Sequence, residues 1–96
     1  MPTYVLLSTL TAEGRRTIKE RPERILEVDK EIEAFGVKLP SQYAVLGAYD
    51  FVNVVEALDN EAIGRASVEL GSRPTVQIMS MPTTPVDEFI AAIKKK

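Results

Sequence analysis

A chain of 96 residues, 45% apolar and 27% charged, predicts one globular domain over 1–96 that is small enough to favour association. It has no cysteine, no histidine, no glycine-rich phosphate loop and no spaced carboxylate cluster, so we expect neither metal nor cofactor. The net charge of −2 excludes a strong polyanion binder, and the short apolar runs predict a soluble, cytoplasmic protein with no membrane segment.

The first elements predicted are a strand and a long helix. Residues 3–10 are rich in β-branched and aromatic types, which favour a strand. Thr11 is a candidate N-cap for a helix over 13–35, in which Pro22 should cause a kink or a break and Gly36 a left-handed stop. Apolar residues recur on one face of this helix: Ile18, Ile25, Val28, Ile32 and Phe35. Its arginines alternate with glutamates, which indicates a solvated face and no nucleic-acid partner.

A hairpin is predicted in the middle of the chain. The second strand should cover 37–46, with Pro40 suited to an edge, and the third should cover 49–57. Gly47 and Ala48 between them fit a two-residue type II′ turn, because that turn requires glycine at its first central position.

The last third predicts a helix, a strand and a second helix. Asp59 should cap a helix that ends near Leu70 at Gly71, and Gly64 inside it indicates either close approach of another backbone or simple tolerance. Residues 73–81 predict the fourth strand. Thr84 should cap a final helix beginning at Pro85, whose apolar residues share one face: Val86, Phe89, Ile90 and Ile93.

This order predicts an α+β, ferredoxin-like βαββαβ fold with an extra C-terminal helix and a four-stranded antiparallel sheet. The first and third strands should be central, with both helices on one face. Both strands carry large apolar residues at alternate positions of either parity, including Val5, Leu7, Val52 and Val54. Since an open apolar face is unusual in a monomer, we expect a homodimer, or a higher homo-oligomer, in which sheets pack face to face.

The stretch "LGAYD", with Gly47, Tyr49 and Asp50, resembles the signature of the GYD-domain family. The similarity extends from "MPTYVLLSTLTAEG" through "VVEALDNE" to Leu70-Gly71, over about residues 1–80. This resemblance implies a dimeric α+β barrel built from the ferredoxin-like unit.

Five residues are candidates for a ligand site: Tyr4, Tyr43, Tyr49, Asp50 and Asn53. Asp50 is either a desolvated acid suited to proton transfer or a turn residue bonded to backbone amides or to an arginine. Asn53 is a polar amide in an apolar strand, so it serves a ligand, a dimer contact or a buried water. The three tyrosines either line a pocket or belong to the core.

Two functions are compatible with this pattern. The first is a homo-oligomeric small-molecule binding or regulatory protein with a small apolar or aromatic ligand in each subunit. The alternative is a cofactor-free enzyme of monooxygenase or isomerase type with Asp50 as acid or base, a possibility that rests on fold analogy. The environment of Asp50 separates them: burial beside a cavity without a cation favours catalysis, and pairing or exposure favours binding.

Overall fold

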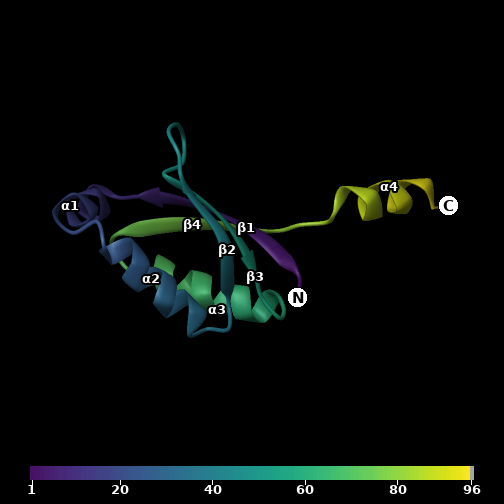
Figure 1. The fold of residues 1–96 in the computed structure, drawn as a ribbon, viewed down its shortest axis with the longest axis horizontal. Helices are drawn as coiled ribbons and strands as arrows, with labels where there is room; N and C mark the ends of the chain where they lie inside the picture. The colour runs from purple at the N-terminus through teal and green to yellow at the C-terminus, as the bar shows by residue number, and fades with distance from the viewer. Residues whose placement is uncertain (96) are drawn as a thin grey trace.

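The computed structural model describes residues 1–95, which form one antiparallel sheet and four helices. The elements are β1 (Thr3–Leu10), α1 (Ala12–Glu20), α2 (Arg24–Glu33), β2 (Lys38–Ala44), β3 (Phe51–Glu56), α3 (Asn60–Gly71), β4 (Val76–Pro82) and α4 (Val86–Lys94). The strand order is β2-β3-β1-β4, with β1 and β3 in the centre (Figure 1). The predicted ferredoxin-like α+β fold with an additional C-terminal helix is therefore confirmed.

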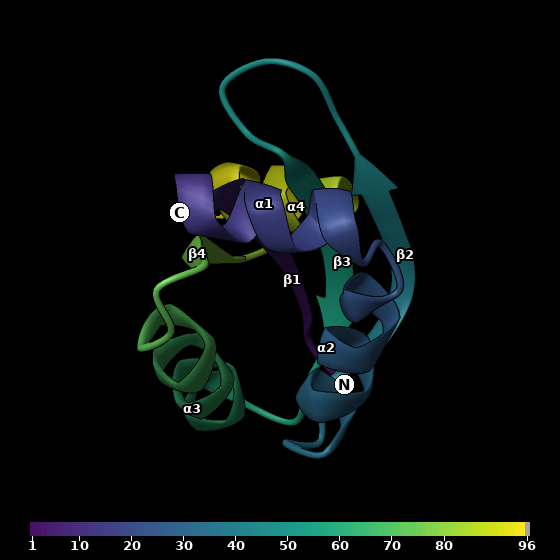
Figure 2. The same ribbon diagram turned by 90° about the vertical axis from the view of Figure 1, so that its left-hand side faces the viewer.

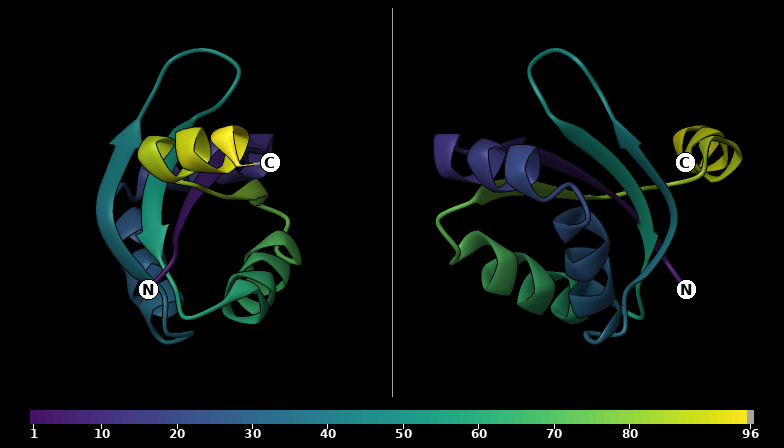
Figure 3. Two further views of the ribbon diagram at one scale, coloured as in Figure 1. Left: turned by 90° about the vertical axis from the view of Figure 1, so that its right-hand side faces the viewer. Right: turned by 60° about the vertical axis from the view of Figure 1, so that its left-hand side comes forward.

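The helices leave one face of the sheet uncovered. Helices α2 and α3 lie on the same side of the sheet, and α1 crosses one of its ends (Figures 1 and 2). Helix α4 lies beyond the opposite end, after β4, and does not cover the sheet (Figure 3). No helix among residues 1–95 combines the length and the apolar character that crossing a bilayer requires.

The core lies between the sheet and its two covering helices. Because successive side chains of a strand point to opposite faces, Tyr4 and Leu6 of β1 and Val55 of β3 all face the helices and are buried. They form one cluster with buried residues of α2, α3 and the connecting segments: Ile32, Val37, Ala57, Ala62, Ile63, Ala66 and Leu70.

Most of the predicted helix boundaries are observed. The break at Pro22 separates α1 from α2, because proline has no N–H to donate to the preceding turn. Thr11 caps α1 by accepting a hydrogen bond from Gly14 N at 3.1 Å, and Asp59 caps α3 by accepting one from Ala62 N at 2.9 Å. Gly36 has a φ of 81°, the left-handed conformation expected after α2.

The prediction of a two-residue hairpin turn was wrong. Strand β2 ends at Ala44 and β3 begins at Phe51, so a longer loop connects them and projects away from α2 and α3 (Figure 1). The pairing of β2 with β3 ends at Ala44 and Phe51, while Asp50 N–H donates to Ser8 O at 2.8 Å and continues the pairing with β1. The base of the loop is closed by Val45 N, which donates to Asp50 O at 2.9 Å.

Two other helix ends differ from the prediction. Helix α4 has Pro85 at its N-cap and no side-chain cap, so Thr84 does not cap it. Gly71 is the last residue of α3 rather than a left-handed stop, since Ser72 follows it in right-handed geometry. A side chain at Gly64 would meet no atom within 4 Å, so of the two interpretations of this glycine simple tolerance is correct.

Gly14 is a position at which only glycine fits. A Cβ there would collide with the backbone carbonyl of Thr75, in the segment between α3 and β4. Two hydrogen bonds hold this contact together: Thr11 N donates to Thr75 O at 3.1 Å, and Thr11 Oγ1 donates to Pro74 O at 2.7 Å. The start of α1 is therefore fixed against the chain that leads into β4.

Candidate functional site

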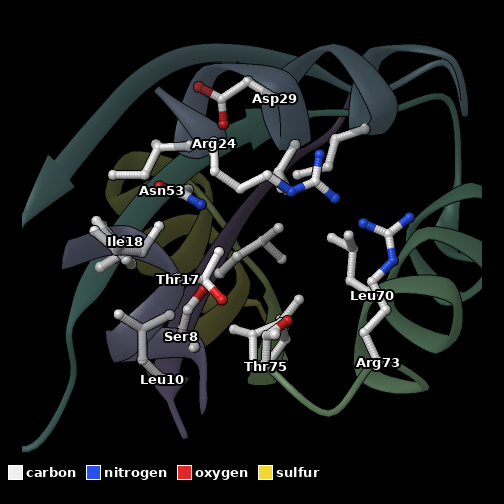
Figure 4. A pocket seen from close by; sticks show the side chains of 18 of the residues that line it. Ser8, Leu10, Thr17, Ile18, Arg24, Asp29, Asn53, Leu70, Arg73 and Thr75 are labelled. Atoms are coloured by element: carbon white, nitrogen blue, oxygen red, sulfur yellow. The ribbon is translucent and has the colours of Figure 1, made fainter. Parts of the chain in front are cut away.

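A cavity of about 280 Å³ lies between the sheet and the helices (Figure 4). Its floor comes from β1 and β3, and its walls come from α1, α2, the end of α3 and β4. The lining is mostly aliphatic and aromatic: Leu6, Leu10, Ile18, Ile25, Val28, Ile32, Phe51, Leu70, Val76 and Ile78. A concave, largely apolar site with a few polar groups is the usual form of a small-molecule site.

Asn53 is the most unusual polar group in the cavity. Its residue on β3 faces Leu6 of β1 and Gln42 of β2 in the sheet register, so its side chain lies on the helix-covered face. It is 5% exposed, and its Oδ1 is buried with no hydrogen-bond partner among residues 1–95. An unpaired buried acceptor costs about 1–3 kcal/mol, so the fold keeps this amide at a cost in stability.

An ion-pair network spans α2 and the segment after α3 beside the cavity. Arg24 Nη1 lies 3.1 Å from Glu27 Oε1 and 3.1 Å from Glu31 Oε1, while the guanidinium of Arg73 pairs with the other oxygen of Glu31. Arg24 and Arg73 both line the cavity (Figure 4). The hydrogen bond and charge of Arg73, together with those of Arg24, lower the pKa of Glu31 despite its partial desolvation.

The lowered pKa of Glu31 predicts a pH-dependent contribution to stability. A carboxylate whose pKa is lowered in the folded state stabilises the protein when the pH is above 4.5, the ordinary pKa of this group. This stability is lost as the pH falls through the folded-state pKa. We expect Glu31→Gln to lower the free energy of unfolding by about 1 kcal/mol at pH 7, since the partly exposed network is screened by solvent.

The measurement is chemical denaturation of wild type and variant at pH 7 and pH 3. The difference between them should shrink at the lower pH. Glu88→Gln, the same change on the exposed helix α4, is the control and should have no effect at either pH. A constant difference at both pH values would contradict this role of Glu31.

Asp29 is a second titratable group at the cavity. Burial raises the pKa of its carboxyl, a hydrogen bond from Gln42 partly offsets that effect, and the charge of Glu33 raises it further. Gln42 Nε2 donates to Asp29 Oδ1 at 2.8 Å, which joins α2 to the edge strand β2. The sequence prediction missed both residues; the only signal was a glutamine within a strand and an aspartate on the apolar side of a helix.

The five residues predicted to form the site are dispersed. Asn53 lines the cavity, whereas Tyr4 is in the core and its hydroxyl donates to Asn60 Oδ1 at 2.7 Å. Tyr43 is 60% exposed on the uncovered face of the sheet, and Tyr49 lies in the loop between β2 and β3. None of the three tyrosines lines this cavity.

Asp50 also lies outside the cavity lining. Its Oδ2 accepts a hydrogen bond from Leu10 N at 2.7 Å, where β1 ends, and it lies 3.4 Å from Arg15 Nη2 at the start of α1. The carboxylate therefore connects the β2–β3 loop to the β1–α1 junction and faces a cation.

The middle of the uncovered sheet face is mainly apolar, with Ser41 on the edge strand β2, and a polar row of Lys38, Glu56 and Thr3 lies at one end. One row runs Ser41, Val54, Val5 and Met81. The next row runs Tyr43, Val52, Leu7 and Met79. This arrangement matches the expectation that the central strands are apolar on both faces, and it leaves the second face open to an apolar partner.

Helix α4 presents a second unpaired apolar surface. The apolar residues on one side of this helix are exposed: Val86 by 70%, Phe89 by 55%, Ile90 by 47% and Ile93 by 67%. The last contacts that hold this segment to the sheet are at Thr83, whose N–H and hydroxyl both donate to Thr3 O. The predicted amphipathic helix exists, but nothing in the described chain covers its apolar side.

Residues 1–95 contain no group of three or more aspartate, glutamate, histidine or cysteine side chains that could hold a metal ion. The polar atoms beside the cavity are amides, hydroxyls and paired charges. This arrangement is suited to binding an organic molecule by shape and hydrogen bonding.

The chain is similar to several known proteins. The profile of the family described as "GYD domain" matches residues 4–93. A Thermus thermophilus protein named "Glutamine synthetase and cystathionine beta-lyase binding protein" is 52% identical over 95 residues, which cover 98% of this chain and 100% of that protein.

Solved structures share the fold at lower identity. The crystal structure of FFRP-DM1 has a TM-score of 0.59 at 22% identity, with 88% of this chain and 100% of that chain covered. A hypothetical protein of Pyrococcus horikoshii has a TM-score of 0.57 at 22% identity, with 88% and 92% covered. At these identities the likeness shows the fold alone.

Proposed function

Because this chain belongs to the GYD domain family, we propose that it is a homo-oligomeric regulatory protein that binds metabolic enzymes and carries a small-molecule cavity in each subunit. The observation that carries the protein-binding role is the exposed apolar stripe of α4. The relative from Thermus thermophilus supports it, since its name states binding to glutamine synthetase and to cystathionine beta-lyase.

Two separate surfaces support two separate contacts. The open sheet face is broad and continuous over the central strands, and it fits a second copy of the same face packed at the usual distance between sheets. Helix α4 lies outside the sheet (Figure 1), and its exposed apolar residues fit recognition of an amphipathic helix by a groove on a partner. We assign the sheet face to self-association and α4 to the partner enzyme.

The environment of Asp50 supports binding over catalysis. An acid for proton transfer should lie beside the reacting molecule, within hydrogen-bond reach. Asp50 instead accepts from a backbone N–H and faces Arg15, away from the cavity lining. No observation favours the enzyme alternative over a binding role.

The test is binding of the purified protein to glutamine synthetase and cystathionine beta-lyase from the same organism, measured by surface plasmon resonance. We expect Phe89→Glu to weaken binding at least tenfold, because a charge would enter the apolar centre of the contact. Ala91→Glu, on the opposite side of α4, is the matched control and should leave the affinity unchanged.

The experiment also measures the mass of the Phe89→Glu variant in solution, which reports its oligomeric state. If α4 contacts the partner enzyme, the variant keeps the wild-type mass and loses only its affinity for the enzyme. A loss of mass would assign α4 to self-association instead, and unchanged affinity for both enzymes would contradict the proposed role of the helix.

A further inference from the structure

We propose that the cavity binds a small, uncharged, mainly apolar molecule that carries one carbonyl oxygen, and that this oxygen accepts a hydrogen bond from Asn53 Nδ2. This inference rests on the proposed binding function and assigns a ligand class to the cavity. Asn53 is the residue that determines specificity.

The first argument is the orientation of the Asn53 amide. The residue is 5% exposed, and its Oδ1 is inaccessible, whereas its Nδ2 is directed toward the cavity (Figure 4). None of the side-chain hydrogen bonds within residues 1–95 involves this amide. Gln42, its neighbour on β2, donates to Asp29 instead. The amide hydrogens of Asn53 are therefore left for a molecule in the cavity.

The second argument is that the other nitrogen groups on the lining are donors too. Arg24 and Arg73 extend toward each other at one side of the cavity, and a guanidinium group only donates hydrogen bonds (Figure 4). Asp29 is the one carboxylate among the lining residues, and it already accepts from Gln42. A ligand with an acceptor oxygen therefore matches this lining better than a ligand that only donates.

The third argument is size. About 280 Å³ is accessible in the cavity. An apolar protein cavity of about 150 Å³ already admits benzene, so this one has room for a fused bicyclic ring. Its walls of leucine, isoleucine, valine and phenylalanine supply apolar contacts on several sides.

The fourth argument is charge, which favours an uncharged ligand. Arg24 and Arg73 are both paired with Glu31, and Arg24 is paired with Glu27 as well. An anionic ligand would have to compete with these carboxylates for the guanidinium groups, and like charges placed close together repel. A carbonyl oxygen needs only the amide hydrogens of Asn53.

The probe pair is 1-indanone and indane, which share a fused-ring frame and differ by one carbonyl group. We expect 1-indanone to bind about tenfold more tightly, because only its oxygen accepts from the amide. Indane is the more apolar of the two, so a site that selects by apolar contact alone would prefer indane. The measurement is an NMR titration of the full-length protein labelled with ¹⁵N.

The same titration reports on the amide itself. The side-chain N–H resonances of Asn53, assigned by their absence from Asn53→Leu, should move downfield with 1-indanone and much less with indane. A merely structural role of this amide would not distinguish the two probes.

Three variants locate the effect. Asn53→Leu keeps a branched side chain of similar shape, has the cavity beside it to accommodate its methyl groups, and should lose the preference for 1-indanone. Ser80→Ala, on the same face of the sheet but outside the cavity lining, should keep the tenfold preference. Thr17→Phe, at the wall formed by α1, should abolish binding of both probes by filling the cavity.

The proposal is overturned if wild type binds neither probe, if it does not prefer 1-indanone, or if the preference survives in Asn53→Leu. Tighter binding of indole, which donates but has no acceptor oxygen, would overturn the acceptor class. Tighter binding of indane-1-carboxylate would overturn the uncharged class.

Should Asn53→Leu fail to fold, the probe preference of wild type, its amide shifts and Thr17→Phe decide the result. The resonances are then assigned from their through-bond couplings to the backbone. Retained binding to the two enzymes with no preference for 1-indanone would reject this inference alone, whereas the reverse result would reject the proposed partner role.

Discussion

Replacing Gly14 by alanine should destabilise the protein by about 3 kcal/mol or more. The added methyl group would collide with the carbonyl of Thr75, and relief of the collision requires α1 to move away from that segment. Such a movement stretches the two hydrogen bonds from Thr11 to Pro74 and Thr75. Overpacking alone costs about 1–3 kcal/mol, and strained hydrogen bonds add to it.

Urea denaturation and thermal melting measure this effect, with an expected fall in Tm of more than about 10 °C for a domain of this size. The control is Gly64→Ala, a glycine inside α3 with no atom near its absent Cβ. That change should stabilise the protein by about 0.5–1 kcal/mol, because alanine favours the helix. Equal effects of the two substitutions would contradict the close contact at Gly14.

Val54→Asp should dissociate the proposed homo-oligomer. Val54 lies in the middle of the uncovered face, between Val5 and Ser41 in the sheet register. An unpaired charge buried between two sheets costs several kcal/mol, so the affinity between subunits should fall at least about a thousandfold. Analytical ultracentrifugation at micromolar concentration measures the change, with an oligomer expected for wild type and a monomer for the variant.

Two controls separate this effect from loss of folding. Val68→Asp makes the same change at a valine of α3 that is 72% exposed, and should leave the mass unchanged. Val54→Thr keeps the β-branched shape without a charge, and should retain the fold with weaker association. A wild-type protein that sediments as a monomer would end the proposal that the open face joins two copies.

The sequence was sufficient for the elements and their order because the signals involved are local. Thr11 and Asp59 cap helices through side-chain oxygens only three residues away, and Pro22 breaks a helix by lacking an N–H. Both β1 and β3 have apolar residues at odd and at even positions, and this pattern also predicted an uncovered apolar face.

The candidate site was less predictable because it depends on contacts between distant parts of the chain. Arg24 and Arg73 meet through Glu31 only once α2 and the end of α3 lie on the same side of the sheet. The collision at Gly14 likewise depends on a loop sixty residues later, so the glycine resembles any other in a helix. Asn53 could be selected as a polar residue in an apolar strand, but its unpaired oxygen required the complete packing.

The turn prediction failed for a similar reason. Gly47 and its neighbours satisfy the local rules for a tight hairpin, and Gly47 does have a φ of 131°. The carboxylate and N–H of Asp50 instead pair with β1, a strand forty residues earlier. Asp50 is therefore held by contacts with β1 that local turn rules do not include.

The short joint between Thr83 and α4 has a consequence for how this protein can evolve. Every buried residue of the core lies before that joint, and the last hydrogen bonds to the sheet are made at Thr83 itself. Substitutions in α4 are therefore distant from the residues that determine stability, and their effects should be nearly independent of those on the core. Natural selection can thus exchange the surface of this helix while the ferredoxin-like unit stays unchanged.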